Sequence, residues 1–202
     1  MSSPTPDDRR AGGKRARTRA ALAAAALEVI AERGLAAASL DEIAARVGMT
    51  KGAIYSNFAG KAELLLEAMR AKGLTFAGDR PPAGSLDEEL ARFADELVAT
   101  LQRAKGEAAF LAEVQLQALG DPELRRGLAD TYESSFTTTA AYLTGLMNPP
   151  PAMPPRDLAV ALQSIALGFL IQSLITPDAV SEAIVRRTVA AFAAGLRGPD
   201  SP

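Results

Sequence analysis

Residues 39–58 of the chain have the sequence SLDEIAARVGMTKGAIYSNF, which predicts two short helices joined by a glycine turn. Ser39, followed three residues later by Glu42, is a capping box, in which the two side chains satisfy free amides at a helix N-terminus. Gly48 suits the left-handed residue that commonly follows a helix C-terminus. The first helix of the pair is therefore expected over residues 39–47.

The second helix is expected over residues 50–57, with Thr50 as its N-cap. Ile54 and Phe58 lie four residues apart and give this helix one apolar face. The side chains left on its outer face are small or carry hydrogen-bond donors: Lys51, Gly52, Tyr55, Ser56 and Asn57. A short helix with such a face, behind a first helix and a turn, is what a helix-turn-helix reader of a DNA groove requires.

The composition is that of a globular, helical protein, with 202 residues of which 48% are hydrophobic and 23% charged. Alanine is abundant and β-branched residues are few, which favours helix. Because the chain has no Cys and no His, disulfides, thiolate nucleophiles, histidine-based triads and most zinc sites are excluded. The sequence also lacks paired-carboxylate spacing and a phosphate loop. We therefore expect no catalytic residues, no metal site, no cofactor and no enzymatic activity.

Charge is distributed unevenly along the chain. Residues 1–70 hold 11 Lys and Arg against 8 Asp and Glu, whereas residues 71–202 hold 11 against 16. A basic N-terminal end on an otherwise acidic protein suits a polyanionic partner at that end. Residues 1–15 are rich in Ser, Pro, Gly and charge, and we expect a disordered basic arm there. This arm is either a solvated tail or an additional attachment to DNA.

Apolar periodicity predicts an all-α fold of about nine helices, because no segment alternates with the period of a strand. The helices expected besides the pair above are 17–33, 61–72 (extending to about 76), 85–104, 107–119, 122–147, 156–175 and 179–196. We predict three parts, namely the basic arm at 1–15, a three-helix DNA-binding domain at 16–60, and a ligand-binding and dimerisation domain at 61–202. Within the last part, the helix at 61–76 is the connection to the DNA-binding domain.

Residues 158–175 form the most apolar stretch of the chain. The stretch is about as long as a membrane span requires, but it contains Gln163, Ser164, Gln172 and Ser173. We interpret it as a buried or dimer-facing helix. The first residues also lack the apolar core of a signal peptide. A cytoplasmic protein with no membrane partner is therefore expected.

Several short segments of residues 17–69 follow one another in a characteristic order. They are Thr18-Arg19, ALEVIAERG at 26–34, SLDEIA at 39–44, KGAIYSNF at 51–58, Lys61, and Glu63-Leu-Leu65. In wording and order they resemble the TetR family of bacterial transcriptional regulators, and QLQALGDPELR at 115–125 is similar to the ligand domains of that family. The chain departs from the family pattern at Asn57, where many members have His, and at Gly60, where Ser or Asp is common. Asn57 still donates hydrogen bonds, so the departure bears on sequence preference rather than on binding.

The resemblance implies that residues 50–57 enter the major groove as a recognition helix. Lys51, Tyr55 and Asn57 would then bind phosphates, while small residues let the helix approach base edges closely. Ser39 has the alternative of a helix cap, and Tyr55 that of a ring packed on the first helix. The expected DNA-binding residues are Thr18, Ser39, Thr50, Lys51, Gly52, Ala53, Tyr55, Ser56, Asn57 and Lys61.

The resemblance further implies a small-molecule site in the body of the protein, meaning the predicted domain at 61–202. It also implies a twofold dimer through the last two helices. The expected ligand-binding residues are Phe93, Phe110, Gln115, Tyr132, Phe136, Gln163 and Phe169. They predict a mostly neutral, apolar ligand, because cationic ligands require buried carboxylates and chelated metals require His. The expected dimer residues are Leu162, Ile165, Phe169, Ile184, Val189 and Phe192. Ordinary core packing is the alternative for every residue of both sets.

We therefore predict a ligand-responsive transcriptional regulator, expected to act as a repressor, that binds double-stranded DNA at a palindromic operator as a homodimer. A small-molecule effector would change DNA affinity by binding the two conformations of the body unequally. The alternative is a helical hydrophobe-binding protein with a vestigial DNA-binding head. An enzyme is a third alternative, disfavoured because the sequence shows no catalytic constellation.

Overall fold

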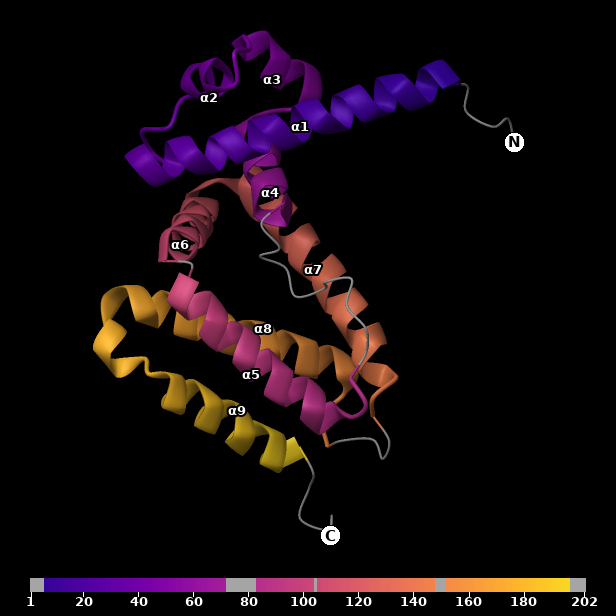
Figure 1. Cartoon of the computed structure of the whole chain (residues 1–202), viewed down its shortest axis with the longest axis vertical. Coiled ribbons are helices and arrows are strands. Elements are labelled where there is room, and N and C mark those ends of the chain that lie inside the picture. The colour runs from indigo at the N-terminus through magenta and orange to yellow at the C-terminus, as the bar shows by residue number, and fades with distance from the viewer. Residues whose placement is uncertain (1–5, 72–82, 104, 148–151, 197–202) are drawn as a thin grey trace. The chain divides into compact units, whose positions relative to one another are not determined.

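The computed structural model describes residues 6–71, 83–103, 105–147 and 152–196. These residues form nine α-helices and one short 3₁₀ helix, and no strand occurs among them (Figure 1). The predicted all-α fold is confirmed. The elements are α1 Pro6–Arg33, α2 Leu40–Arg46, α3 Lys51–Asn57, α4 Lys61–Ala71, α5 Leu86–Arg103, α6 Lys105–Gly120, α7 Pro122–Thr144, α8 Pro155–Ile175, η1 Pro177–Ala179 and α9 Glu182–Leu196.

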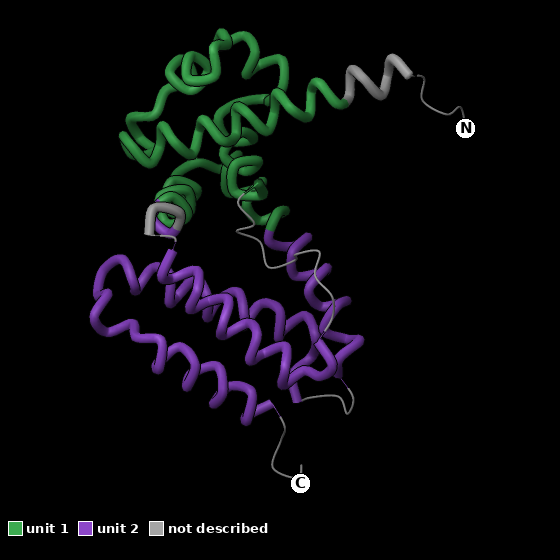
Figure 2. The backbone as a smooth tube through the Cα atoms, in the orientation of Figure 1, with its two compact units in different colours: residues 1–74, 110–131 green, residues 75–109, 132–202 purple. Residues whose placement is uncertain are grey.

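The chain divides into two compact units (Figure 2). The head unit consists of residues 1–74 and 110–131, and the body unit of residues 75–109 and 132–202. Helices α6 and α7 each contribute residues to both units. The head unit is larger than the predicted domain at 16–60, because α4 packs along α1 and belongs with it.

The core of the head unit is built on α1, which packs against α2, α3 and α4 (Figure 1). Leu22 and Val29 of α1 lie on one face at helical spacing, and both are fully buried. Ile43 of α2 and Ile54 of α3 are fully buried as well. Each such side chain contributes about 2 kcal/mol on burial. Together they fix α2 and α3 on α1.

Helix α1 begins at Pro6, whereas the sequence predicted a disordered arm over residues 1–15. That prediction is wrong for residues 6–15, and residues 1–5 lie outside the described residues. Proline is tolerated in the first helical turn, and the Ala and Arg residues that follow are strong helix formers. They carry the helix across its glycines, where Arg17 Nε donates to the Gly13 carbonyl at 3.2 Å.

The predicted helix-turn-helix is formed by α2 and α3. Ser39 Oγ accepts a hydrogen bond from the Glu42 amide at 3.1 Å and so caps α2. Gly48 has a φ of +67°, in the left-handed region. The Met49 amide then donates to the Ala44 carbonyl at 2.9 Å, which closes the end of α2 as a Schellman turn.

Two details of the predicted caps differ in the structure. The Glu42 carboxylate lies 2.7 Å from the Arg33 guanidinium of α1, so it joins α2 to α1 rather than completing the capping box. The prediction that the Thr50 side chain caps α3 is wrong, because its hydroxyl makes no capping bond. Thr50 contributes only its carbonyl, which accepts from the Ala53 amide at 2.9 Å.

The body unit is built on α5, which packs against α8 and α9 (Figure 1). Leu90, Phe93 and Leu97 of α5 repeat at helical spacing and are buried. Helix α8 is long and apolar enough, by length and composition alone, to cross a membrane, although the core helix of a soluble protein passes the same test. Only 33% of its most apolar window is fully buried in a single chain, and Ile175 at the end of the helix is 71% exposed.

Candidate nucleic-acid interface and ligand site

The outer face of α3 is exposed and its inner face is buried. Ile54 and Phe58 are 0% and 2% exposed, whereas Lys51, Gly52 and Ser56 lie on the surface. Tyr55 is 56% exposed, which favours an outward-facing side chain over a ring packed on α1. A short helix thus presents a cation and a phenol hydroxyl outward, with Gly52 and the half-buried Ala53 leaving little bulk between them.

The ammonium of Lys51 is paired with Asp41 of α2. Lys51 Nζ lies 2.9 Å from Asp41 Oδ2, and this hydrogen bond raises the pKa of Lys51 above its ordinary value. Both side chains are well exposed, so water competes for their charged groups and the ion pair is weak. A phosphate oxygen can therefore replace Asp41. The sequence patterns did not single out Asp41, because no local pattern joins residues on different helices.

Other predicted DNA-binding side chains bond to carbonyls of their own helices. Ser56 Oγ donates to Gly52 at 2.9 Å, and Asn57 Nδ2 donates to Ala53 at 2.8 Å. Thr18 Oγ1 donates to the carbonyl four residues earlier in α1, at 3.1 Å. These hydroxyl and amide groups contact DNA only by exchanging or sharing such local bonds. Ser39 is already engaged as the cap of α2.

Lys61 lies in an unexpected place for a phosphate contact. Its ammonium donates to the carbonyls of Leu35 and Ala38 at 2.9 and 2.8 Å. Burial lowers the pKa of Lys61 below its ordinary value. The cation is thus used inside the head unit, in the turn between α1 and α2.

Arg19 links several helices of the head unit, a role that the sequence did not indicate. Its guanidinium donates to Glu63 and Glu67 of α4 at 3.0 and 2.8 Å, and also to the Asn57 carbonyl. The same group lies 4.2 Å from the centre of the Phe58 ring, a cation–π contact. Arg19 therefore joins α1 to α4 and to the end of α3. The sequence feature that could have indicated this role is the pair Glu63 and Glu67, which lie four residues apart and so share one helix face.

The predicted ligand-binding residues fall into both units. Phe110 and Gln115 belong to the head unit, where Phe110 is buried. The other residues of the set are in the body unit: Phe93, Tyr132, Phe136, Gln163 and Phe169. Tyr132 and Phe136 stack, with ring centroids 6.2 Å apart and planes inclined by 20°. The structure therefore brings together this aromatic pair of α7.

The interior of the body unit contains polar groups that the apolar ligand model did not anticipate. Glu89 of α5 is 3% exposed, and its Oε2 accepts from Arg92 at 2.8 Å and from the Tyr142 hydroxyl of α7 at 2.7 Å. Because Tyr142 bonds to α5, the face of α7 that carries it is turned toward α5. Ser135 and Thr139 share that face, since they precede Tyr142 by two turns and one turn.

Three buried side-chain oxygens have no hydrogen-bond partner in the part of the chain that the structure describes. They are Ser135 Oγ, Thr139 Oγ1 and Gln163 Oε1. Exposed hydroxyls of the same helix α7 behave differently, because Thr137 and Thr138 donate to carbonyls four residues earlier, both at 2.9 Å. A buried polar atom without a partner is costly, so these three oxygens are unfavourable features of the body unit as a single chain.

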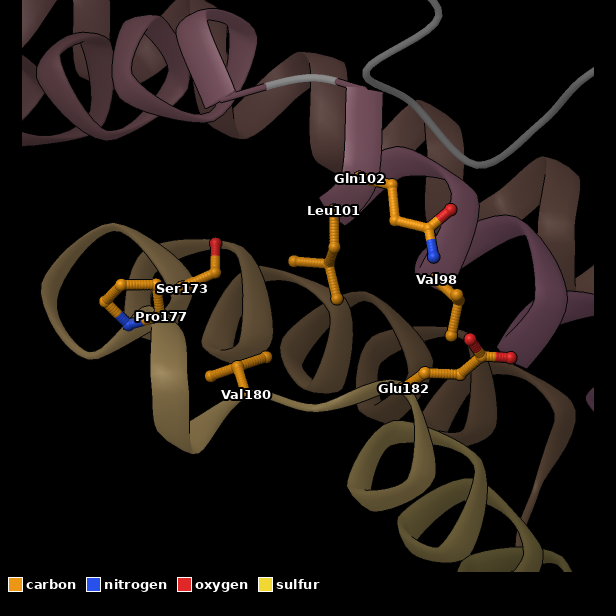
Figure 3. Close-up of a pocket in the computed structure, with 7 residues that line it drawn as sticks. All are labelled: Val98, Leu101, Gln102, Ser173, Pro177, Val180 and Glu182. Atoms are coloured by element: carbon orange, nitrogen blue, oxygen red, sulfur yellow. The ribbon is translucent and has the colours of Figure 1, made fainter.

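Two surface pockets of the body unit lie elsewhere. A pocket of about 200 Å³ is lined by residues of α5, the end of α8, η1 and the start of α9, as Figure 3 shows. A second pocket, of about 460 Å³, follows the groove between α5 and α9, where Asp95 and Arg186 form an ion pair. Neither pocket includes a predicted ligand-binding residue. Among the described residues, acidic side chains form no cluster that could hold a metal ion.

The predicted dimer residues differ in exposure. Leu162 and Val189 are buried within a single chain, at 5% and 2% exposed, so ordinary core packing accounts for them. Ile184 of α9 is 39% exposed, and Ile175 at the end of α8, which the sequence did not single out, is 71% exposed. The remaining members of the set are half-buried: Ile165, Phe169 and Phe192. Exposed apolar surface is thus present on both α8 and α9.

Known families match both parts of the chain. The model for bacterial regulatory proteins of the tetR family matches residues 22–68, and that for the C-terminal region of BetI-type transcriptional repressors matches residues 86–198. The regulator SrpR of Pseudomonas putida is 42% identical over 55 residues, or 27% of this chain and 26% of SrpR, so the match spans about a quarter of SrpR. The uncharacterized regulator YdeS of Bacillus subtilis is 26% identical over 180 residues, covering 85% of this chain and 86% of YdeS.

Solved structures share the fold at low sequence identity. GusR of Salmonella enterica has a TM-score of 0.70 at 17% identity, covering 90% of this chain and 96% of GusR. NalD, the secondary repressor of the MexAB-OprM multidrug efflux pump in Pseudomonas aeruginosa, has a TM-score of 0.62 at 22% identity, covering 92% and 98%. The family matches are consistent with the helix-turn-helix formed by α2 and α3 and with the all-α fold. The chain therefore belongs to the TetR family of bacterial regulatory proteins, with a C-terminal region of the BetI type.

Proposed function

We propose that the protein is a dimeric, cytoplasmic repressor that reads a palindromic operator with α3 and changes its DNA affinity when a small molecule binds the body unit. The observation that carries the proposal is the outer face of α3, where Lys51 and Tyr55 are exposed above the buried Ile54 and Phe58. Little side chain stands between them, so the helix can enter a major groove closely.

In this proposal Lys51 and Tyr55 bind phosphates, and Lys51 exchanges the carboxylate of Asp41 for a phosphate oxygen. Thr50 is the most available candidate for base contacts, because its hydroxyl is not used as a helix cap. Ser56 and Asn57 share their local carbonyl bonds with DNA. The likeness in fold to NalD, which is a repressor, supports repression as the mode of regulation.

The homodimer is supported by the exposed apolar surface of α8 and α9. Ile175 and Ile184 are both exposed, and only a third of the apolar window of α8 is fully buried in one chain. A second copy related by a twofold axis would cover such surface and place two copies of α3 on a palindrome. Sedimentation velocity at micromolar concentration should show a dimer, and a monomer there would contradict this part of the proposal.

Effector binding is supported by the buried oxygens of Ser135, Thr139 and Gln163. A ligand with hydroxyl or amide groups would satisfy them, which a purely apolar ligand would not. We therefore propose an effector that has an apolar frame, suited to Phe93 and the aromatic pair of α7, together with hydrogen-bonding groups. A ligand that binds only one conformation of the body shifts the population toward it and so changes DNA affinity.

A gel-shift experiment on the DNA upstream of the protein's own gene tests the proposed function. We expect retardation at low salt that weakens as salt is raised, because neutralised phosphates release counterions. Unlabelled DNA of the same length and unrelated sequence should compete poorly. Absence of retardation at low salt would contradict the proposal and favour a hydrophobe-binding protein whose DNA-binding head is vestigial.

A further inference from the structure

The turn between α1 and α2, residues 34–38, is held by charged side chains from two other helices. Gly34 opens the turn with a φ of +78°, and Leu35 and Ala38 are each 3% exposed. Helix α2 starts at Leu40, directly after the turn, and α3 packs on α2. The placement of the turn therefore sets where α2 and α3 lie on α1.

Lys61 holds the turn from α4. Its ammonium donates to the carbonyls of Leu35 and Ala38, 2.9 and 2.8 Å away, so it bonds near both ends of the turn. A lysine that neutralises a DNA phosphate needs an ammonium open to the solvent, as that of Lys51 is. The ammonium of Lys61 is instead partly buried and occupied by two backbone acceptors.

Glu113 holds the same turn from α6. Its Oε2 accepts from the Leu35 amide at 2.5 Å, and it lies 3.8 Å from where a Cβ on Gly34 would be. A hydrogen bond between a carboxylate and a backbone amide is charge-assisted and among the stronger kinds. Leu35 thus gives its amide to α6 and its carbonyl to α4.

We propose that Lys61 and Glu113 are positioning residues of the DNA-binding surface, which hold the 34–38 turn from α4 and α6 and thereby fix α2 and α3. The proposal rests on the proposed function, DNA binding through α3. Lys61 then affects DNA binding through the turn and is not a phosphate contact, contrary to the expectation from the sequence.

Through the same contacts, the position of α6 also affects the position of α3. Helix α6 is continuous, with residues 105–109 in the body unit and Glu113 in the head unit. If a change in α6 withdraws Glu113, the buried Leu35 amide loses its acceptor, which is costly. The turn therefore follows α6 or loses its fixed conformation, and α2 and α3 shift in either case.

Hydrogen exchange at the Leu35 amide tests the Glu113 contact without DNA. Glu113→Ala removes the acceptor, whereas Glu113→Gln keeps an oxygen in its place. Glu123→Ala, which removes an exposed carboxylate from the first turn of α7, is the matched control. We expect exchange at Leu35 to be about tenfold faster in Glu113→Ala, and close to wild type in the other two variants. Unchanged exchange in Glu113→Ala would overturn the proposal.

The salt dependence of DNA binding tests the role of Lys61, with the upstream DNA as the probe. A phosphate contact lowers the slope of log affinity against log salt by about one unit when its charge is removed. A positioning residue lowers affinity and leaves that slope unchanged. We expect Lys61→Met to bind about tenfold more weakly with the wild-type slope, and Lys51→Ala to lose slope. A loss of about one unit of slope in Lys61→Met would overturn the proposal.

Further variants distinguish a failure of this proposal from a failure of the proposed function. Glu113→Ala should weaken DNA binding like Lys61→Met, and Glu113→Gln should restore most of the affinity. Lys61→Gln, which keeps a donor group, is a second variant for the case in which Lys61→Met fails to fold, and the same slope is expected. If wild type did not bind DNA at low salt, the proposed function would fail, while exchange at Leu35 would still decide whether Glu113 holds the turn.

Discussion

Lys51 of α3 and Asp41 of α2 form an ion pair with their charged atoms 2.9 Å apart. The exposed ammonium of Lys51 on α3 therefore already has an acidic partner before DNA is bound. Since Asp41 also places a negative charge beside the expected phosphate, it opposes DNA binding in two ways. We therefore expect the pair to limit the affinity of the protein for DNA of any sequence.

We predict that Asp41→Asn raises DNA affinity by about two- to fivefold, because it frees Lys51 and removes the repulsion of a phosphate. Affinity is measured by fluorescence anisotropy with the upstream DNA and with unrelated DNA. Asp130→Asn, which removes an exposed carboxylate from α7 in the head unit, is the control. Equal or weaker binding by Asp41→Asn would show that the ion pair does not restrain Lys51.

Arg19→Ala should lower the free energy of unfolding by about 2 kcal/mol, since it removes charge-assisted bonds to two glutamates and the contact with the Phe58 ring. Arg19→Lys should restore little, because a single ammonium lacks the forked geometry that serves both carboxylates. Urea denaturation measures the loss. Arg15→Ala, on the exposed part of α1, is expected within about 0.5 kcal/mol of wild type. Equal stabilities of the Arg19 and Arg15 variants would refute the role assigned to Arg19.

The Glu63 carboxylate should make the head unit sensitive to acid. A hydrogen bond from the Ala59 amide at 2.7 Å holds the pKa of Glu63 below its ordinary value, and the hydrogen bond from Arg19 lowers this pKa by a smaller amount. A folded-state pKa below the unfolded one contributes stability above the unfolded pKa, and that contribution is lost as pH falls through the folded pKa. Glu63→Gln should therefore be less stable than wild type at pH 7, with the difference shrinking toward pH 3. A pH-independent difference would contradict this assignment.

Thr139→Val should stabilise the ligand-free protein by about 1 kcal/mol, because it replaces a buried hydroxyl without a partner by a methyl group of the same shape. The corresponding rise in melting temperature is about 2–4 °C for a chain of this size. Thr138→Val is the control, since its hydroxyl is exposed and bonded to the Ser134 carbonyl. A loss of stability in Thr139→Val would mean that the hydroxyl is satisfied in the native protein.

The helix-turn-helix could be predicted from the sequence because its determinants are local. Ser39 caps the helix that follows it, and Gly48 takes the left-handed conformation at the helix end. The partners of Arg19 and Lys61 could not be predicted, because they depend on how α1, α4 and α6 pack. Lys61 occupies the position of a phosphate contact in the motif, yet its ammonium bonds to a turn 23 residues earlier in the chain.

The ligand and dimer residues were predicted less well for a related reason. Apolar periodicity identifies a buried face but does not say whether another part of the chain or another molecule covers it. Val189 is covered by its own chain, while Ile175 is not. The buried Glu89 was missed because carboxylates are expected at the surface, and only tertiary structure brings the Tyr142 hydroxyl to it.

The most direct test of the central claim is the DNA affinity of the double variant Lys51→Ala, Tyr55→Ala. Fluorescence anisotropy with the upstream DNA is compared for wild type, this variant and Arg103→Ala, which removes an exposed charge from α5 of the body unit. If the outer face of α3 binds DNA, the double variant should bind at least about tenfold more weakly, while Arg103→Ala should match wild type. Wild-type affinity in the folded double variant would contradict the assignment of α3 as the reading helix.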